Sequence, residues 1–190
     1  LDNITKYFIG MTDSHASLAK KLEERFSNEL THCTTVHDQV TVTVAADDLL
    51  SVCKILRDDE QFAFMQLSDL CGVDYLTYGQ VDWSTKESTS TGFSRGRQDN
   101  DQESSHNINE RFAVVYHLLS IKHNIRLRLR CYLSDEYPRI ASVSGIWSSA
   151  DWFEREAFDL FGILFEGHPD LRRLLTDYGF IGHPFRKDFP

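Results

Sequence analysis

Apolar and polar residues alternate most regularly over 125–133. The apolar positions in this stretch are Ile125, Leu127, Leu129, Cys131 and Leu133. Because the side chains of a strand point to opposite faces in turn, this pattern predicts a strand with one buried face, and Arg126, Arg128, Arg130 and Tyr132 on the other. The polar step at 122–124 predicts a hairpin that joins it to an earlier strand over 111–120.

Two segments have the spacing of amphipathic helices. Over 14–26 the apolar residues recur at every fourth position, which predicts a helix lying on the sheet; they are Leu18, Leu22 and Phe26. The second predicted helix follows Asp47, whose side chain would cap it, and ends at Asp58 and Asp59. Its expected buried stripe consists of Leu49, Val52, Cys53 and Leu56.

Two more stretches predict strands. Over 36–44, Val40, Val42 and Val44 share one face. The apolar stretch 62–78 predicts another strand, with a break at Cys71-Gly72. Strands with amphipathic helices on one face indicate an α+β fold with a mostly antiparallel sheet, a C-terminal helix and an extended tail.

The segment 83–109 is almost wholly polar. Such a composition cannot bury enough apolar surface to offset the entropy of ordering. We interpret it as a mobile hairpin loop, with order induced by a partner as the alternative. The length of 190 residues then suits a core domain over 1–150 and a C-terminal interface segment over 151–190.

Composition and charge narrow the class of protein. The contents of 41% hydrophobic and 26% charged residues are typical of globular domains. A net charge of −9 without any basic run longer than two residues disfavours nucleic-acid binding. No apolar run reaches the length of a membrane span, so any membrane association is expected through partners. The sequence begins at Leu1 and not at a methionine, so the question whether a targeting segment has been removed stays open.

The last thirty-nine residues, 152–190, combine many aromatics with many charges. Their nine aromatic residues are Trp152, Phe153, Phe158, Phe161, Phe165, Tyr178, Phe180, Phe185 and Phe189. Ser148 and Ser149 before Asp151 form a weak capping box for a helix that ends at Phe161, before Gly162. Large apolar side chains are stabilised by burial, whereas unpaired charges beside them are costly to bury, so we expect another surface to cover this segment, and that surface could belong to another protein.

The charges of this helix allow three interpretations. Helical spacing lets Arg155 reach Asp159, with Glu156 and Asp159 three positions apart. Close carboxylates can serve as an acid/base pair, exposed ion pairs can simply stabilise the helix, and charges buried against another subunit can fix how two surfaces dock. We favour docking.

Two Gly-His-Pro turns follow, at 167–169 and 182–184. Pro169 suits the first position of a short helix that would bury Leu171, Leu174 and Leu175 and stop at Gly179. His168 and His183 are interpreted as hydrogen-bond donors that fix the turns, with metal ligation as the alternative. The stretch 183–190 is expected to be an extended strap over a neighbouring surface. The cysteines Cys33, Cys53, Cys71 and Cys131 form no metal-binding pattern.

In this same segment the sequence resembles the 30-kilodalton-type (C-type) subunit of proton-pumping NADH:quinone oxidoreductase (respiratory complex I). The motifs that carry the resemblance are Glu154-Arg155-Glu156, Asp159-Leu160-Phe161-Gly162, His168-Pro169-Asp170-Leu171-Arg172-Arg173, Gly182-His183-Pro184 and Arg186-Lys187-Asp188-Phe189-Pro190. The match is looser over 62–133, where Val73-Asp74-Tyr75 is similar to a strand ending of the family.

The resemblance implies a non-catalytic subunit of the peripheral arm without a cofactor of its own, since FMN and the iron–sulfur clusters belong to partner subunits. It implies contacts with the quinone-site (D-type) subunit and with the iron–sulfur (B- and I-type) subunits. The location implied is the cytoplasmic side of the bacterial inner membrane, or the matrix side in mitochondria. Other members commonly continue beyond the Asp-Phe-Pro ending in a tail that wraps a neighbour. The expected partner-interface residues are Glu154, Arg155, Glu156, Asp159, His168, Arg172, Arg173, His183, Arg186 and Lys187.

Two alternatives stay open. One is the equivalent subunit of a membrane-bound hydrogenase or formate-linked complex, which the identity of the partners would distinguish. The other is a free-standing acid/base or metal-dependent hydrolase that uses Glu154, Glu156, Asp159 and His168. Stoichiometric zinc or manganese in the purified chain would favour the hydrolase.

Overall fold

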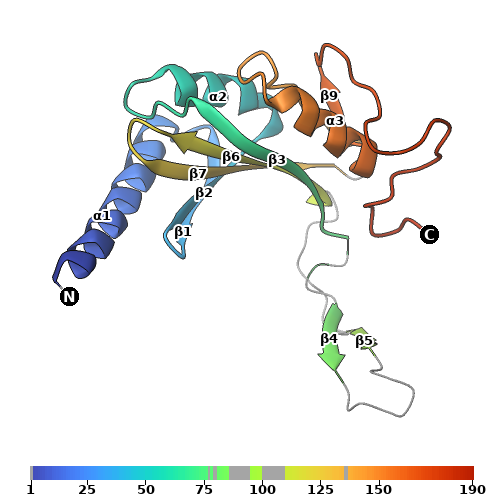
Figure 1. Cartoon of the computed structure of the whole chain (residues 1–190), viewed down its shortest axis with the longest axis horizontal. Coiled ribbons are helices and arrows are strands. Elements are labelled where there is room, and N and C mark those ends of the chain that lie inside the picture. The colour runs from blue at the N-terminus through green and yellow to red at the C-terminus, as the bar shows by residue number, and fades with distance from the viewer. Residues whose placement is uncertain (1, 77, 79–80, 86–94, 100–109, 135–136) are drawn as a thin grey trace.

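The centre of the molecule is a five-stranded sheet. The computed structural model describes residues 2–76, 78, 81–85, 95–99, 110–134 and 137–190 (Figure 1). The sheet has the order β1-β2-β7-β6-β3, and only β2 and β7 run parallel. Its strands are β1 (Leu30–Val36), β2 (Gln39–Val44), β3 (Gln66–Asp74), β6 (Phe112–Ser120) and β7 (Ile125–Leu133). The predicted α+β class with a mostly antiparallel sheet is confirmed.

Three α-helices accompany the sheet in the described residues: α1 (Asp2–Arg25), α2 (Leu49–Asp58) and α3 (Ala150–Phe161). Figure 1 shows α2 and α3 on the same side of the sheet. The predicted helix over 14–26 is confirmed as the end of α1, whose apolar stripe enters the same core as that of α2. Within the described part of the chain, no helix has both the length and the apolar character that a bilayer crossing requires.

The start of α2 differs from the prediction. Asp47 lies in the short 3₁₀ turn η1 (Ala46–Asp48), and Asp48 takes the capping position without a side-chain cap hydrogen bond. The predicted end is confirmed, because α2 stops at Asp58 and Asp59 follows it in an extended conformation. The predicted inner stripe of α2 is also buried.

The predicted strand over 36–44 is in fact the end of one strand, a turn and another strand. His37 and Asp38 have φ values of 50° and 57°, and Val36 pairs with Gln39. Two consecutive left-handed residues form the tight turn whose twist suits a hairpin. Val36 falls on the same alternate positions as Val40, Val42 and Val44, and this shared spacing concealed the polar turn between them, so β1 was missed. The buried face of β2, with Val40, Val42 and Val44, is as predicted.

Strand β3 runs through Cys71-Gly72 without the predicted break. A Cβ at Gly72 would lie 2.7 Å from the ring of Phe161, at the end of α3. The glycine therefore allows α3 to pack closely on β3 and does not interrupt the strand. The hairpin between β6 and β7 is confirmed, with Ser120 paired to Ile125.

Part of the segment 83–109 forms a second, smaller hairpin. Strands β4 (Val81–Thr85) and β5 (Arg95–Asp99) pair antiparallel. The rest of this segment lies outside the described residues, so its mobility stays a prediction.

The chain after α3 contains one more strand and then irregular turns. Strand β8 (Arg139–Ala141) pairs in parallel with β9 (Leu164–Glu166), so the segments before and after α3 lie side by side. Residues 167–190, which we call the strap, contain no helix, and the short helix predicted after Pro169 is wrong. The backbone N–H groups of Leu174, Leu175 and Thr176 all point at one carboxylate, that of Asp159.

Candidate functional site

Helix α3 carries its charged motif on the side that faces the protein. Gly162 ends the helix in the left-handed conformation, with φ of 74°, as predicted. The capping box is absent, because Ser149 donates its hydroxyl to the carbonyl of Leu67 instead. Glu154 and Asp159 are both 0% exposed. Two fully buried carboxylates on one helix must be satisfied within the fold or they destabilise it.

Glu154 is satisfied by the loop that precedes α3. Its carboxylate accepts the hydroxyl of Ser142 at 2.6 Å and the backbone N–H of Val143 at 2.7 Å. Burial raises the pKa of Glu154, and these two hydrogen bonds oppose part of the rise. Sequence reasoning missed Ser142, which lies eight residues before the helix and has no pattern of its own.

His168 fixes its turn, in agreement with its predicted role. Its Nδ1 lies 3.0 Å from the backbone N–H of Asp170 and its Nε2 lies 3.1 Å from the carbonyl oxygen of Asp151. Since the N–H can only donate and the carbonyl can only accept, the ring is in its neutral Nε2–H form. The Glu154 carboxylate is 3.8 Å from Nε2. The first Gly-His-Pro turn is thereby tied to the start of α3.

The carboxylate of Asp159 accepts hydrogen bonds from several residues of the strap. One oxygen, Oδ2, accepts the N–H groups of Leu174, Leu175 and Thr176 at 2.7–3.0 Å. The other, Oδ1, accepts the Arg173 guanidinium at 3.0 Å and the Thr176 hydroxyl at 2.6 Å. Burial alone would raise the pKa of Asp159, but these hydrogen bonds outweigh it and hold the pKa well below its usual range.

The arginines of the motif bind the strap through backbone oxygens. Arg155 does not pair with Asp159 as predicted, because its guanidinium donates to the carbonyls of Arg172 and Arg173 and lies over the ring of Trp152. Arg173 also donates to the carbonyl of Gly182 at 3.0 Å. The predicted pairing failed because helical spacing permits two side chains to meet but does not exclude better partners elsewhere in the fold.

The second Gly-His-Pro turn docks on the end of α3. His183 donates from Nδ1 to the carbonyl of Asp159 at 2.9 Å, and Arg186 donates to the carbonyl of Phe161 at 2.6 Å. Burial lowers the pKa of His183, with the neighbouring arginines adding to the effect. These carbonyls belong to the last turn of the helix, which leaves its C=O groups without helical partners. The prediction of an extended strap over 183–190 is wrong in conformation, because this stretch lies in turns against its own chain, and its contact with a neighbouring subunit stays a prediction.

A third anchor joins the end of the strap to the sheet. Asp74, at the end of β3, accepts the guanidinium of Arg111 at 2.8–2.9 Å and the N–H of Lys187 at 2.8 Å. Arg111 also pairs with Asp188 at 2.8 Å. Burial would raise the pKa of Asp74, but these donors lower it. Asp74 and Arg111 were not among the predicted site residues, although Val73-Asp74-Tyr75 was part of the resemblance.

The ten predicted interface residues therefore fall into two groups. Seven have their side chains hydrogen-bonded within the chain: Glu154, Arg155, Asp159, His168, Arg173, His183 and Arg186. Glu156 is half-buried, while Arg172 and Lys187 are exposed. Arg172 pairs with the exposed Asp170, at 2.9 Å. Contact of any of the ten with a partner stays a prediction.

The strap displays apolar side chains on its outer side. Ile181 is 90% exposed, and Tyr178 is fully exposed. Other exposed apolar residues of the strap and its surroundings are Trp152, Leu175, Phe180 and Phe185. An exposed apolar surface rimmed by polar groups is typical of a protein–protein contact.

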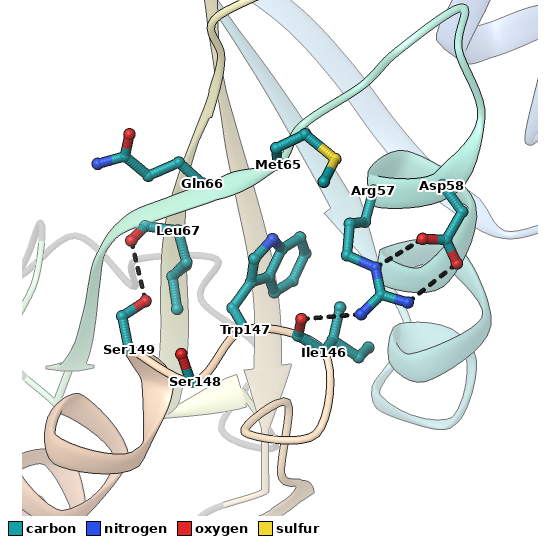
Figure 2. A pocket seen from close by; sticks show the side chains of 9 residues that line it. All are labelled: Arg57, Asp58, Met65, Gln66, Leu67, Ile146, Trp147, Ser148 and Ser149. Atoms are coloured by element: carbon teal, nitrogen blue, oxygen red, sulfur yellow. Dashed lines mark hydrogen bonds and ion pairs between the residues drawn. The ribbon is translucent and has the colours of Figure 1, made fainter.

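Two open clefts lie among the described residues. One, of about 450 Å³, is lined by residues from 57–67 and 146–149. Figure 2 shows Arg57 held by Asp58 and by the carbonyl of Ile146, and Ser149 bonded to the carbonyl of Leu67. The other, of about 500 Å³, lies where Asp74 and Phe161 meet the strap at Phe185 and Arg186.

The hydrolase constellation does not assemble as one cluster. Glu154 and His168 are close, whereas Asp159 is engaged with 173–176. Among the described residues, no three His, Cys, Asp or Glu side chains are grouped as metal ligands would be.

Residues 42–190 match the family model "Respiratory-chain NADH dehydrogenase, 30 Kd subunit". The chain belongs to this family. The C-type subunit of the NADH-quinone oxidoreductase of Coxiella burnetii is 56% identical over 175 residues, which cover 92% of this chain and 77% of that protein. Its counterpart in Legionella pneumophila is 54% identical over 173 residues, 91% of this chain and 76% of that protein.

Two solved structures share the fold. A trypsin-resistant fragment of Nqo5 superposes with a TM-score of 0.57 at 31% identity, covering 81% of this chain and 98% of the fragment. A chain of the membrane-bound sulfane sulfur reductase, an archaeal respiratory membrane complex, gives a TM-score of 0.53 at 16% identity, covering 92% of this chain and 85% of that chain. The second likeness shows the fold alone.

Proposed function

We propose that this 30-kilodalton-type subunit has a structural role in NADH-quinone oxidoreductase and that the chemistry belongs to its partners. In this proposal electrons pass from NADH through FMN and iron–sulfur clusters on other subunits to quinone, coupled to proton translocation. The chain would lie in the peripheral arm on the cytoplasmic side of the inner membrane, in contact with the quinone-site (D-type) and iron–sulfur (B- and I-type) subunits.

The observation that carries the proposal is the use of the charged motif. Its buried carboxylates bind groups of the strap and of the loop before α3, and the half-buried histidines of the strap bind backbone carbonyls of α3, through contacts of 2.6–3.1 Å. A catalytic acid or base needs access to a substrate proton, whereas a buried and fully bonded carboxylate holds structure. The motif therefore supports a rigid strap that presents its exposed apolar side chains to another subunit.

The test uses bacteria that lack their own 30-kilodalton-type subunit and express this chain. Tyr178→Ser with Ile181→Ser removes two exposed apolar groups from the strap. We expect less of the variant chain in the enzyme isolated from membranes, and quinone reduction per membrane protein that falls in proportion. The activity per assembled enzyme should be unchanged, because the chain carries no reacting group.

The matched control is Ile121→Ser, since Ile121 is 69% exposed at the turn between β6 and β7. It should assemble as the wild type does. Glu156→Lys and Arg172→Glu, each in a folded chain, test the same interface with charge. Normal assembly of the double serine variant and of both charge variants would refute the docking role. Full assembly with reduced turnover per enzyme would refute the non-catalytic role.

A further inference from the structure

The face of the sheet opposite α2 and α3 carries a row of arginines on its central strand. Arg126, Arg128 and Arg130 alternate along β7 with residues that are fully or almost fully buried in the core. Successive side chains of a strand point to opposite faces, so all three arginines lie on the side away from the core. We call this the open face.

The strand register extends the open face on both sides of β7. Arg128 is paired with Thr41 of β2 and with His117 of β6, and His117 is paired with Asp69 of β3. Residues paired across strands share a face of the sheet, so these side chains form one row. In the next row, Arg130 lies between Thr43 and Val115. The residues paired directly with the three arginines are therefore uncharged or, at His117, weakly basic, and none is a carboxylate.

The guanidinium groups are incompletely satisfied within the described residues. Arg126 is exposed and makes no ion pair there. Arg128 donates to the amide oxygen of Gln39 at 2.8 Å. Arg130 lies over the ring of Tyr132, and its buried Nε has no hydrogen-bond partner in this part of the chain. A guanidinium has five donors, so this row offers many N–H groups to an acceptor from outside.

The pKa of His117 reflects the charges on the open face. Burial lowers the pKa of His117, and the positive charges of Arg128 and Arg126 lower it further, while Asp69 opposes them. Asp69 is the acidic residue that the register places in the row of Arg128 and His117. Two more carboxylates act at the margins of the face, Glu156 on Cys71 and Glu110 on Tyr132, so the incompletely bonded guanidinium donors, and not a net positive charge, mark the strip of arginines as a place for an acceptor.

We propose that the open face, centred on Arg126, Arg128 and Arg130, binds a carboxylate-bearing segment of a partner polypeptide. Guanidinium groups bind carboxylates in a two-point geometry, which fixes both position and orientation. The chain as a whole carries −9, so a long polyanion or an anionic membrane would be repelled by the rest of the surface, whereas a short acidic segment meets only the strip.

This contact is separate from the strap and extends the proposed function by adding a second protein interface. The proposed contact depends on the proposed function in one respect, because its partner is sought in the assembled enzyme. The first test places an amine where the strip is exposed. In Arg126→Lys the charge is kept, and a carbodiimide can join the lysine to a carboxylate that it touches.

We expect a cross-link in the isolated enzyme from position 126 to an Asp or Glu of another polypeptide, identified by mass spectrometry. Lys54, exposed on α2, is present in the same sample and reports cross-linking on the other side of the molecule. A cross-link from 126 that joins only residues of this chain, or no cross-link at 126, would overturn the proposal.

The second test reverses charge. Arg126→Glu with Arg128→Glu should lower the amount of chain recovered in the enzyme at least about tenfold, because two attractive contacts become repulsive. Lys21→Glu with Lys54→Glu makes the same change in net charge at two exposed sites and should have little effect. Arg126→Glu alone, at an exposed position, covers the case in which the double variant unfolds, as judged by circular dichroism.

The outcomes separate the two proposals. If the wild-type chain assembles and the reversed variants assemble equally well, the open face is not an interface, and the proposed function is unaffected. If the wild-type chain is absent from the enzyme, the proposed function fails. Binding to vesicles of phosphatidylglycerol that the double reversal abolishes, without a cross-link at 126, would identify a lipid as the occupant and overturn the polypeptide.

Discussion

Asp159→Asn is the sharpest test of how the strap is held. The substitution keeps the size of the side chain and replaces one carboxylate oxygen by an NH₂ group. Five donors point at the carboxylate, three at Oδ2 and two at Oδ1. With the NH₂ at the Oδ2 position three backbone donors face another donor, and with it at the Oδ1 position the Arg173 guanidinium does, because only the Thr176 hydroxyl can turn and accept instead.

The loss follows from that count. A hydrogen bond to a charged acceptor contributes about 1.5–3 kcal/mol, so one lost bond costs about that much and three lost bonds cost about 4.5–9 kcal/mol. A typical domain is stable by only about 5–15 kcal/mol. Residues 174–176 are outside the main core, however. We therefore expect the strap to open locally while the sheet stays folded.

Amide hydrogen exchange measures this directly. In Asp159→Asn the N–H groups of Leu174, Leu175 and Thr176 should exchange much faster, with the amides of β6 and β7 unchanged. Asp170→Asn is the control, because this exposed carboxylate pairs with the exposed Arg172 and should contribute about 0–1 kcal/mol. Unchanged protection of the three amides in Asp159→Asn would show that the Asp159 carboxylate does not hold the strap in place.

Lowering the pH should act like the substitution. The folded pKa of Asp159 is depressed below its unfolded value, so its contribution is complete above the ordinary aspartate pKa of about 3.9 and is lost as the pH falls through the folded value. Exchange of the strap amides, corrected for the intrinsic rate, should therefore accelerate in acid.

Three further predictions concern the other anchors. Gly162→Ala should lower the thermal unfolding temperature more than Gly167→Ala does. Both glycines have a positive φ, which costs alanine about 1–2 kcal/mol. Only at Gly162, however, would the added Cβ lie 2.6 Å from side chains of the strap. Arg111→Met should cost about 3–5 kcal/mol in denaturant unfolding, because it leaves the buried carboxylate of Asp74 unpaired. For Glu154→Gln, the stability advantage of the wild type should shrink as the pH rises from about 4.3 through the raised pKa of Glu154, since charging this buried group destabilises the folded state.

Each of these has a contrary result. Equal unfolding temperatures for the two glycine variants would mean that the strap adjusts around a methyl group at no cost. An Arg111→Met chain as stable as the wild type would show that the third anchor is dispensable. A constant difference between wild type and Glu154→Gln over that pH range would mean that Glu154 keeps an ordinary pKa.

The repetitive parts of the fold were predictable from sequence because a single period describes them. The alternation over 125–133 predicted β7 with its bounds. The recurrence of Leu18, Leu22 and Phe26 at every fourth position predicted the end of α1. An error arose where valines on both sides of a turn kept the same even spacing. Val36 and Val40 lie four positions apart across the turn at His37 and Asp38, and so two strands were taken as one.

The candidate site divides in the same way. The sequence determined which residues carry the charged motif, that α3 ends at Gly162, and that His168 and His183 belong to turns, because these properties depend on neighbours within a few positions. Only the tertiary structure decided the partners. Asp159 meets residues 173–176 and Asp74 meets Arg111 and Lys187, pairs that are 14 to 113 positions apart. Hydrogen bonding depends on distance in space, which helical or strand spacing fixes only within one element, so the chain must fold before a charge has a partner.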